Sequence, residues 1–304
     1  MPELPEVETV ARGLQREIAG RRVVSVTLGK TDFMDNPGEI ERLLPGAEIR
    51  SVERYGKFML LWLRRSEPAE SAALLVHLGM TGGMMPRPVS DPQRKHTHLV
   101  ALLDDGRELR YVDPRRFGRL ALLVGAALER ELLRFGADPL EVKLDEFVAR
   151  IRARRARIKM LLLDQQVLRG VGNIYADESL WKAKIHPAQV GARIQPEHLQ
   201  RLYRALQEIL RKAILLRGSS ISDFLDAAGA PGEYQLHHKA YGREGKACYR
   251  CKTPIRRMMV AGRSSYFCPN CQKKPRDARL GRRTKPVLGR GPSKRLVKVA
   301  SRRG

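Results

Sequence analysis

The first residues of the chain combine a potential amine nucleophile with nearby carboxylates. Met1 precedes Pro2, and removal of the methionine would leave Pro2 as a free secondary amine. An α-amino group has a pKa near 8, so about a tenth or more is neutral at pH 7 and able to attack a carbon such as a sugar C1′. Glu3, Glu6 and Glu8 follow, and one of them could protonate a leaving group. The alternative is that the prolines merely begin a helix whose dipole favours these acids.

The cysteines form a second set with chemical meaning. They make two CxxC pairs, Cys248/Cys251 and Cys268/Cys271, with sixteen residues between the pairs. Four thiolates at this spacing fit tetrahedral Zn²⁺, although two disulfides or free thiols are the alternative. Four sulfur ligands leave no open coordination position, so one structural zinc is predicted. The residues between the pairs can form the hairpin of a zinc ribbon, with Arg263 near its tip, where the cation could reach a phosphate.

The charge of the chain indicates its partner. Among 304 residues there are 58 Lys and Arg against 33 Asp and Glu, a formal charge of +25. Such a chain needs a polyanion, and nucleic acid is favoured over an anionic membrane surface because no basic amphipathic helix dominates. No apolar run reaches the ~18 residues of a membrane helix. The opening MPELPEVETV lacks the pattern of a signal peptide, so a cytoplasmic location is expected.

The last residues carry a disproportionate share of this charge. From Lys273 to Gly304 there are 13 Lys or Arg and one acid, with prolines and glycines throughout and almost no apolar periodicity. This composition predicts disorder. Either the tail is simply solvated, or it is a non-specific DNA arm that adds salt-dependent affinity.

The hydrophobic pattern predicts strands first and helices afterwards. Residues 6–19 have helical spacing, and 125–217 are helical again, with Pro196 opening a long amphipathic helix that stops at Gly218. Residues 218–240 are rich in Gly, Ser and Pro and predict a mobile loop. Several short strands between the two helical regions favour an antiparallel sandwich or barrel over a parallel sheet. The strand-like stretches are 21–28, 47–63, 72–80, 96–104, 107–113 and 118–124.

The chain resembles a known family in many separate motifs. The opening PELPEVETVARGL is similar to that of the bacterial formamidopyrimidine-DNA glycosylases, bifunctional repair enzymes that excise oxidised purines. The resemblance runs from Pro2 to Cys271 and leaves only the tail outside. The other motifs that carry it are Tyr55-Gly56-Lys57, HLGMTG at 77–82, KHTH at 95–98, DPRRFG at 113–118, LLLDQQVLRGVGNIYADESLW at 161–181, SSISDFLDAAGAPGEY at 219–234, and YGREGKAC at 241–248.

The resemblance implies an α+β multidomain fold. It places an N-terminal antiparallel β-sandwich with an N-terminal helix at 2–135, a helix–two-turn–helix domain with a lesion loop at 136–237, and a zinc ribbon at 238–272. The disordered basic tail would be 273–304. It also implies a base-excision repair enzyme with AP-lyase activity that acts on damaged double-stranded DNA as a monomer, without a membrane.

The resemblance assigns catalytic roles to five residues. Pro2 would be the nucleophile that forms a Schiff base, and Glu3 the general acid. Glu6 matches a second carboxylate near the sugar. Lys57 matches a lysine credited with phosphate contact and proton transfer during β-elimination. Arg263 matches an arginine that holds phosphates beside the lesion and takes part in δ-elimination.

A further set of residues would contact DNA. Met80, Arg115 and Phe117 match the three side chains that fill the hole left by a flipped base, which offsets a cost of a few kcal/mol. Without the family, Met80 and Phe117 would be interpreted as core residues. The basic run 152–159 supports phosphate binding independently of the family, although such a run is most often a solvated helix face. A glycine-rich turn before a helix also exposes N–H groups suited to a phosphate. The remaining expected DNA contacts are His96, Arg154, Lys159 and Asn173.

Two alternatives to a purine-excising enzyme stay open. One is an endonuclease VIII-type glycosylase for oxidised pyrimidines, against which the Leu4-Pro5-Glu6-Val7 continuation and the DPRRF motif argue. The other is a non-catalytic zinc-ribbon DNA-binding protein, which would need none of Pro2, Glu3 and Lys57. Gly232-Glu233-Tyr234 departs from the aromatic pair that many relatives have in the lesion loop.

Overall fold

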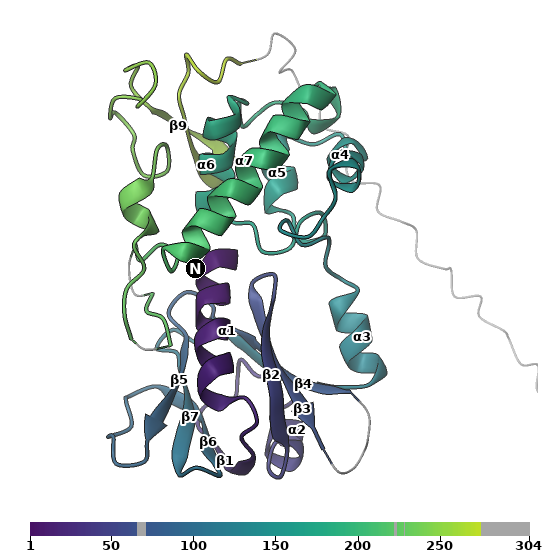
Figure 1. The fold of residues 1–304 in the computed structure, drawn as a ribbon, viewed down its shortest axis with the longest axis vertical. Coiled ribbons are helices and arrows are strands. Elements are labelled where there is room, and N and C mark those ends of the chain that lie inside the picture. Colours follow the sequence, from purple (N-terminus) through teal and green to yellow (C-terminus); the bar gives the residue numbers. More distant parts are fainter. Residues whose placement is uncertain (66–70, 222–223, 228, 275–304) are drawn as a thin grey trace, which may run out of the picture.

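The structure is a computed structural model that describes residues 1–65, 71–221, 224–227 and 229–274. The predicted basic tail therefore lies outside the described residues from 275 onwards. The described chain has a lower part built from sheets and an upper part built from helices, with the zinc-ribbon strands beside the helices (Figure 1).

Two four-stranded antiparallel sheets form the N-terminal part. One has the strand order β1–β6–β7–β5 and the other β2–β3–β4–β8. Apolar residues from both sheets and from the first helix make one shared core, which confirms the predicted sandwich. The strands are β1 (Val23–Leu28), β2 (Glu48–Tyr55), β3 (Phe58–Arg64), β4 (Ala72–His77), β5 (Gly83–Pro88), β6 (Thr97–Leu103), β7 (Arg107–Val112) and β8 (Arg119–Val124).

The predicted stretch 47–63 is two strands rather than one. The chain turns between β2 and β3, where Gly56 has φ of 65°, a conformation that glycine adopts without steric cost. Strand β5 and the short helix α2 (Pro37–Leu43) were not predicted. Pro86 and Pro88 weaken the strand pattern, but β5 lies at an edge of its sheet, where prolines are tolerated.

Helix α1 (Leu4–Ile18) connects the two halves of the molecule. It runs along the sheets, and its first turn, which carries the N-terminus, lies beside the end of α7 (Figure 1). Val7, Val10 and Leu14 face the sandwich core, whereas Leu4 belongs to the core of the helical part. The beginning of α1 is therefore at the junction between the two parts.

The helical part packs around α6 and α7. The predicted helix from Pro196 is confirmed and ends at Leu215, shortly before the predicted Gly218. The segment predicted as a loop, 218–240, contains a short 3-10 helix, Tyr234–His237, whose Tyr234 belongs to this core. The helices of this part are α4 (Leu144–Arg152), α5 (Ile158–Leu163), α6 (Asn173–Ala183) and α7 (Pro196–Leu215). Helix α3 (Ala126–Leu132) packs instead against the sheet that contains β8.

The C-terminal described residues form the predicted ribbon. Strands β9 (Arg256–Val260) and β10 (Arg263–Phe267) pair antiparallel. Ala261 and Gly262 between them both have positive φ, as the two central residues of a type I′ hairpin turn require. Arg263 is consequently the first residue after the tip. Among the described residues, no helix has the length and apolar character needed to cross a membrane.

Candidate active site and nucleic-acid interface

A cavity of about 810 Å³ lies where the sandwich, the helical part and the zinc hairpin meet. It brings together residues that are far apart in the sequence, from the N-terminus to the tip of the hairpin. It does not include His96, Arg115, Phe117 or Lys159. The predicted site residues that line it are Pro2, Glu3, Glu6, Lys57, Met80, Arg154, Asn173 and Arg263.

Glu3 lies against the N-terminus of α6. Its carboxylate accepts hydrogen bonds from the backbone N–H of Ile174 at 3.0 Å and of Tyr175 at 3.3 Å. The residue is 4% exposed. Burial raises the pKa of Glu3, while the charge of Lys57 and the two N–H groups oppose the rise. A carboxyl group with a raised pKa is suited to deliver a proton near neutral pH.

Glu6 is one turn further along α1 and is fully enclosed by donors. The backbone N–H of Glu3 donates to Oε2 at 2.8 Å, and that of Ser219 to Oε1 at 2.6 Å. The hydroxyl of Tyr175 also donates to Oε1. Burial, followed by the nearby charge of Glu3, raises the pKa of Glu6 to about 7. Glu6 can therefore change its protonation state near neutral pH.

Lys57 supplies the positive charge of the site. It lies in the turn between β2 and β3 and is 8% exposed. Burial lowers the pKa of Lys57, the charge of Glu3 opposes this, and the charge of Arg263 lowers the pKa further. A lysine in such surroundings can give up and take a proton more readily than one in water. We call Glu3, Glu6 and Lys57 the cavity floor.

Two glycines make room for the acids of the floor. Gly172 immediately precedes α6, and a Cβ at this position would overlap the carboxyl group of Glu3. Gly218 has φ of +78°, and a Cβ there would lie 2.6 Å from Oε1 of Glu6. A side chain at either position would displace a carboxylate from its donors.

Four exposed residues, which we call the rim, lie at the cavity or on the loop next to it. Met80 and Arg263 line the cavity, whereas Arg115 and Phe117 are on a loop whose backbone contacts Gly79, next to Met80. Met80 is 41% and Phe117 55% exposed. The guanidinium carbon of Arg115 lies 4.5 Å from the centroid of the Phe117 ring. His96 is also exposed, on a neighbouring loop. Exposed apolar side chains can stack against bases, and the cations beside them can contact phosphates.

Asp113 anchors the two loops that carry most of the rim. Its buried carboxylate accepts from the hydroxyl of Thr81, beside Met80, at 2.7 Å. It also accepts from the N–H of Gly118, beside Phe117, at 2.9 Å. One carboxylate thus fixes the spacing of the loop tips. Asp113 was not predicted, although it begins the DPRRFG motif.

Two of the predicted DNA contacts, Lys159 and Arg154, already have acidic partners within the protein. Lys159 is 0% exposed, and its Nζ binds Asp177 at 2.6 Å and the carbonyl of Ser264 at 2.8 Å. It joins α5 and α6 to the zinc hairpin, and its burial gives no support to the predicted contact with DNA. Arg154 lines the cavity but is ion-paired with Asp164.

The glycine-rich turn before α6 also differs from its prediction. Asn173 does line the cavity. However, the N–H groups of Ile174 and Tyr175 donate to Glu3 and not to a phosphate. Tyr175 and Ser219, which hold Glu6, were missed, although both occur in the quoted motifs; no local pattern indicates that they contact the N-terminus.

The four cysteines form a site for one structural zinc. All are free thiols, and their sulfur atoms lie within 4.8 Å of one another. Cys251 is 3.4 Å from Cys268 and 3.5 Å from Cys271, measured between sulfur atoms. Ligands ~2.3 Å from a tetrahedral centre lie about 3.8 Å apart, so the set fits Zn²⁺ with small adjustments. The zinc stabilises the hairpin that presents Arg263.

Buried acids and a lysine of lowered pKa in a strongly basic chain are typical of an enzyme that works on nucleic acid. Residues 1–120 match the family described as the formamidopyrimidine-DNA glycosylase N-terminal domain, and residues 135–225 match its H2TH domain. Residues 245–274 match the zinc finger found in FPG and IleRS. The chain therefore belongs to the formamidopyrimidine-DNA glycosylase family.

Individual relatives agree with this assignment. The formamidopyrimidine-DNA glycosylase of Herpetosiphon aurantiacus is 44% identical over 277 residues, covering 90% of this chain and 100% of the relative. That of Solibacter usitatus is 42% identical over 276 residues, with the same coverage.

Solved structures give the same result. The MutM (FPG) protein of Thermus thermophilus matches with a TM-score of 0.78 and 38% identity, covering 90% of this chain and 100% of its own. The Lactococcus lactis FPG in complex with a Fapy-dG containing DNA matches with a TM-score of 0.80, 33% identity and the same coverage.

Proposed function

We propose that this protein excises oxidised purines, 8-oxoguanine and formamidopyrimidines, from duplex DNA and then cuts the strand by β,δ-elimination. The observation that carries the proposal is the single cavity in which Pro2, Glu3, Glu6, Lys57 and Arg263 meet. A protein that only binds DNA has no need for buried acids whose pKa values are raised, so the cavity favours an enzyme over a zinc-ribbon binding protein.

The first step uses the amine of Pro2, after removal of Met1, which is half exposed. The amine attacks C1′, the bond from C1′ to the base breaks, and the base leaves with the bond electrons and takes up the proton that the amine nitrogen gives up. Opening of the sugar ring gives the iminium form of the Schiff base, and the ring oxygen takes up a proton. Glu3 lies in the same cavity as Pro2 and is the proposed donor of that proton.

The elimination steps use the other groups of the cavity. Loss of a proton from C2′ of the iminium breaks the bond to the 3′ phosphate, and a second elimination breaks the bond to the 5′ phosphate. Lys57, which lines the cavity, is proposed to move protons and to hold a phosphate. Arg263, at the exposed hairpin tip, neutralises phosphate charge. Glu6 is proposed to provide a second carboxylate near the sugar. The zinc has no open position and takes no part in the chemistry.

The rim is proposed to extrude the base. Unstacking a base costs a few kcal/mol, and inserted side chains offset this cost. Phe117 can wedge the stack and Arg115 can hydrogen-bond the orphaned base, while Met80 fills the gap from the other loop. His96 and Arg154 would contact phosphates. On DNA binding, Arg154 would give up its ion pair with Asp164 and contact a phosphate instead.

We further propose the domain boundaries 2–135, 136–237, 238–272 and 273–304. A complete cavity is built from one chain, which supports a monomer as the working unit. The cytoplasm, where bacterial DNA lies, is the proposed location.

The proposal is tested with a panel of lesion duplexes. Excision is measured under single turnover on 8-oxoguanine, formamidopyrimidine and oxidised pyrimidine substrates, with borohydride added in parallel. We expect faster excision of the oxidised purines and a covalent protein–DNA product that depends on borohydride. Preference for pyrimidines would favour an endonuclease VIII-type activity. Binding without excision or trapping would contradict an enzyme altogether.

A further inference from the structure

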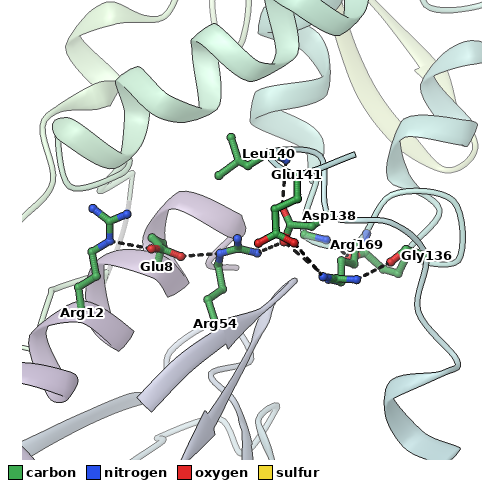
Figure 2. Close-up of polar contacts among 10 residues, drawn as sticks. Glu8, Arg12, Arg54, Gly136, Asp138, Leu140, Glu141 and Arg169 are labelled. Carbon is green, nitrogen blue, oxygen red and sulfur yellow. Dashed lines mark hydrogen bonds and ion pairs between the residues drawn. The ribbon is translucent and has the colours of Figure 1, made fainter. Parts of the chain in front are cut away.

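A chain of ion pairs crosses the boundary between the sandwich and the helical part (Figure 2). None of its residues is among those that line the cavity. Arg54 of β2 is its centre: Nε binds Glu8 of α1 at 2.7 Å, and Nη1 binds Asp138 at 2.6 Å. Arg169 lies 3.6 Å from the same oxygen of Asp138 and donates to the carbonyl of Gly136 at 2.9 Å. We call Glu8, Arg54, Asp138 and Arg169 the interdomain ion network.

The centre of the network is buried. The side chains of Arg54 and Asp138 are 7% and 2% exposed, and those of Glu8 and Arg169 are 17% and 18% exposed. Desolvation lowers the pKa of Arg54, but Asp138 and then Glu8 more than offset this, so that its pKa is raised overall. Arg54 is therefore a permanent charge with two acid partners.

Three residues of the network lie close in sequence to residues that line the cavity. Arg54 is three residues before Lys57, in the strand that leads into the Lys57 turn. Glu8 is on the same helix as Glu3. Arg169 is four residues before Asn173, where α6 begins and donates to Glu3.

Backbone contacts carry the connection from the network to the floor. The N–H of Leu4 donates to the carbonyl of Gly170 at 3.0 Å, next to Arg169. The guanidinium of Arg169 stacks on the ring of Tyr55 at 4.3 Å, next to Gly56. A shift of Arg169 relative to Arg54 would therefore move α6 relative to both Glu3 and Lys57.

We propose that Arg54 and Asp138 are positioning residues that set the alignment of Glu3, Lys57 and the N-terminus of α6 across the domain boundary. The inference rests on the proposed function, because it concerns the rate of base excision. The ion pair is not needed for stability alone, since apolar replacements of a buried pair often stabilise as well as the ions. An apolar pair would lack the directional hydrogen bonds by which the Arg54 guanidinium holds Glu8 and Asp138 in fixed positions.

The test separates alignment from stability. Arg54→Met leaves Asp138 buried without its main partner, whereas the double variant Arg54→Met/Asp138→Leu removes both charges. Arg54→Lys keeps the charge but lacks the planar fork that reaches two acids. Arg12→Met is the matched control, because Arg12 binds Glu8 from the solvent side and is 62% exposed. Each variant is measured for thermal unfolding, for affinity to a duplex with a tetrahydrofuran abasic analogue, and for single-turnover excision.

We expect excision by the double variant to be about 10- to 100-fold slower than wild type, as misalignment of about an ångström can cause. Its duplex affinity should stay within about twofold of wild type and its unfolding midpoint close to that of wild type, because both charges of the pair are removed together. Arg54→Lys should be intermediate in rate. Arg12→Met should match wild type in all three measurements.

Normal excision in the double variant would overturn the inference, because the pair would then serve stability alone. A decrease in affinity as large as the decrease in rate would also overturn it. If wild-type protein did not excise any lesion, the proposed function would fail, and the inference with it. If wild-type protein excised the lesion and the Arg54 and Asp138 variants did so at the same rate, the inference would fail and the proposed function would stand.

Discussion

The cavity floor and the rim use charged side chains in opposite ways. Glu3, Glu6 and Lys57 are almost fully buried, so burial shifts their pKa values, and hydrogen-bond donors hold the two acids. Phe117 and the cations of the rim are exposed and lie on loop or hairpin tips. Burial tunes proton transfer, whereas exposure leaves a side chain free to meet a partner. We therefore propose that proton transfer is the task of the floor and that contact with DNA is the main task of the rim.

The largest effect is expected from Glu3→Gln in the floor. The amide keeps the size of the side chain but cannot deliver a proton, so excision should fall by about 10²- to 10⁴-fold. Affinity for a duplex containing an abasic analogue should be retained, because Glu3 is buried and the rim is unchanged. Single-turnover excision measures the expected loss of rate, and binding titrations measure the retained affinity. Excision at the wild-type rate would mean that Glu3 is not the acid.

A second effect concerns stability and pH. The pKa of Glu6 is raised from 4.5 to about 7 in the folded protein, so the folded state binds more protons than the unfolded state between these pH values. Its contribution to the free energy of unfolding must therefore fall as pH rises from about 4.5 to 7. The total change is on the order of 3 kcal/mol.

Glu6→Gln is the matched comparison, because zinc release and other titrations affect both proteins equally. Denaturant unfolding at pH 5, 6, 7 and 8 should show the variant gaining stability relative to wild type up to about pH 7, and little beyond. If the free energy of unfolding depended on pH in the same way for both proteins, the raised pKa of Glu6 would be contradicted.

A smaller effect is expected at the rim. Phe117→Ala removes the side chain that replaces a stacked base, and such stacking is worth ~1–3 kcal/mol. Excision from a fully paired duplex should slow by about 10-fold or somewhat more, with a smaller decrease when the lesion is in single-stranded DNA. The measurement is the excision rate of Phe117→Ala relative to wild type on the paired duplex and on single-stranded DNA. An equal decrease on both would assign Phe117 to the floor's chemistry and not to base extrusion.

The smallest effect on excision is expected from the tail, which lies outside the described residues. Deleting 275–304 removes 11 Lys and Arg and none of the residues assigned to chemistry. Single-turnover excision should be unchanged, whereas the slope of log affinity against log salt should flatten by about 0.9 for each phosphate that the tail neutralises in the full-length protein. Duplex binding over a salt series measures this. Equal slopes for full-length and truncated protein would show that the tail does not engage DNA.

The sequence predicted best what depends on local spacing. The zinc site follows from two CxxC pairs, and the helix from Pro196 follows from its apolar period. The family motifs placed Pro2, Glu3 and Lys57 in one site, and all three line the cavity. Contacts between distant segments had no local signal: nothing around Glu3 indicates that it caps α6, about 170 residues away. The basic run 152–159 likewise does not reveal that Lys159 points inward, because charge alone does not determine burial.

The central claim is that Pro2, which lines the cavity together with the buried acids Glu3 and Glu6, is the nucleophile. Wild-type protein is incubated with a lesion duplex and borohydride, the trapped complex is digested with protease and nuclease, and the modified residue is located by mass spectrometry. The account predicts a reduced sugar remnant on the nitrogen of Pro2 in protein that has lost Met1. A remnant on the side chain of Lys57, or on any other lysine, would contradict it.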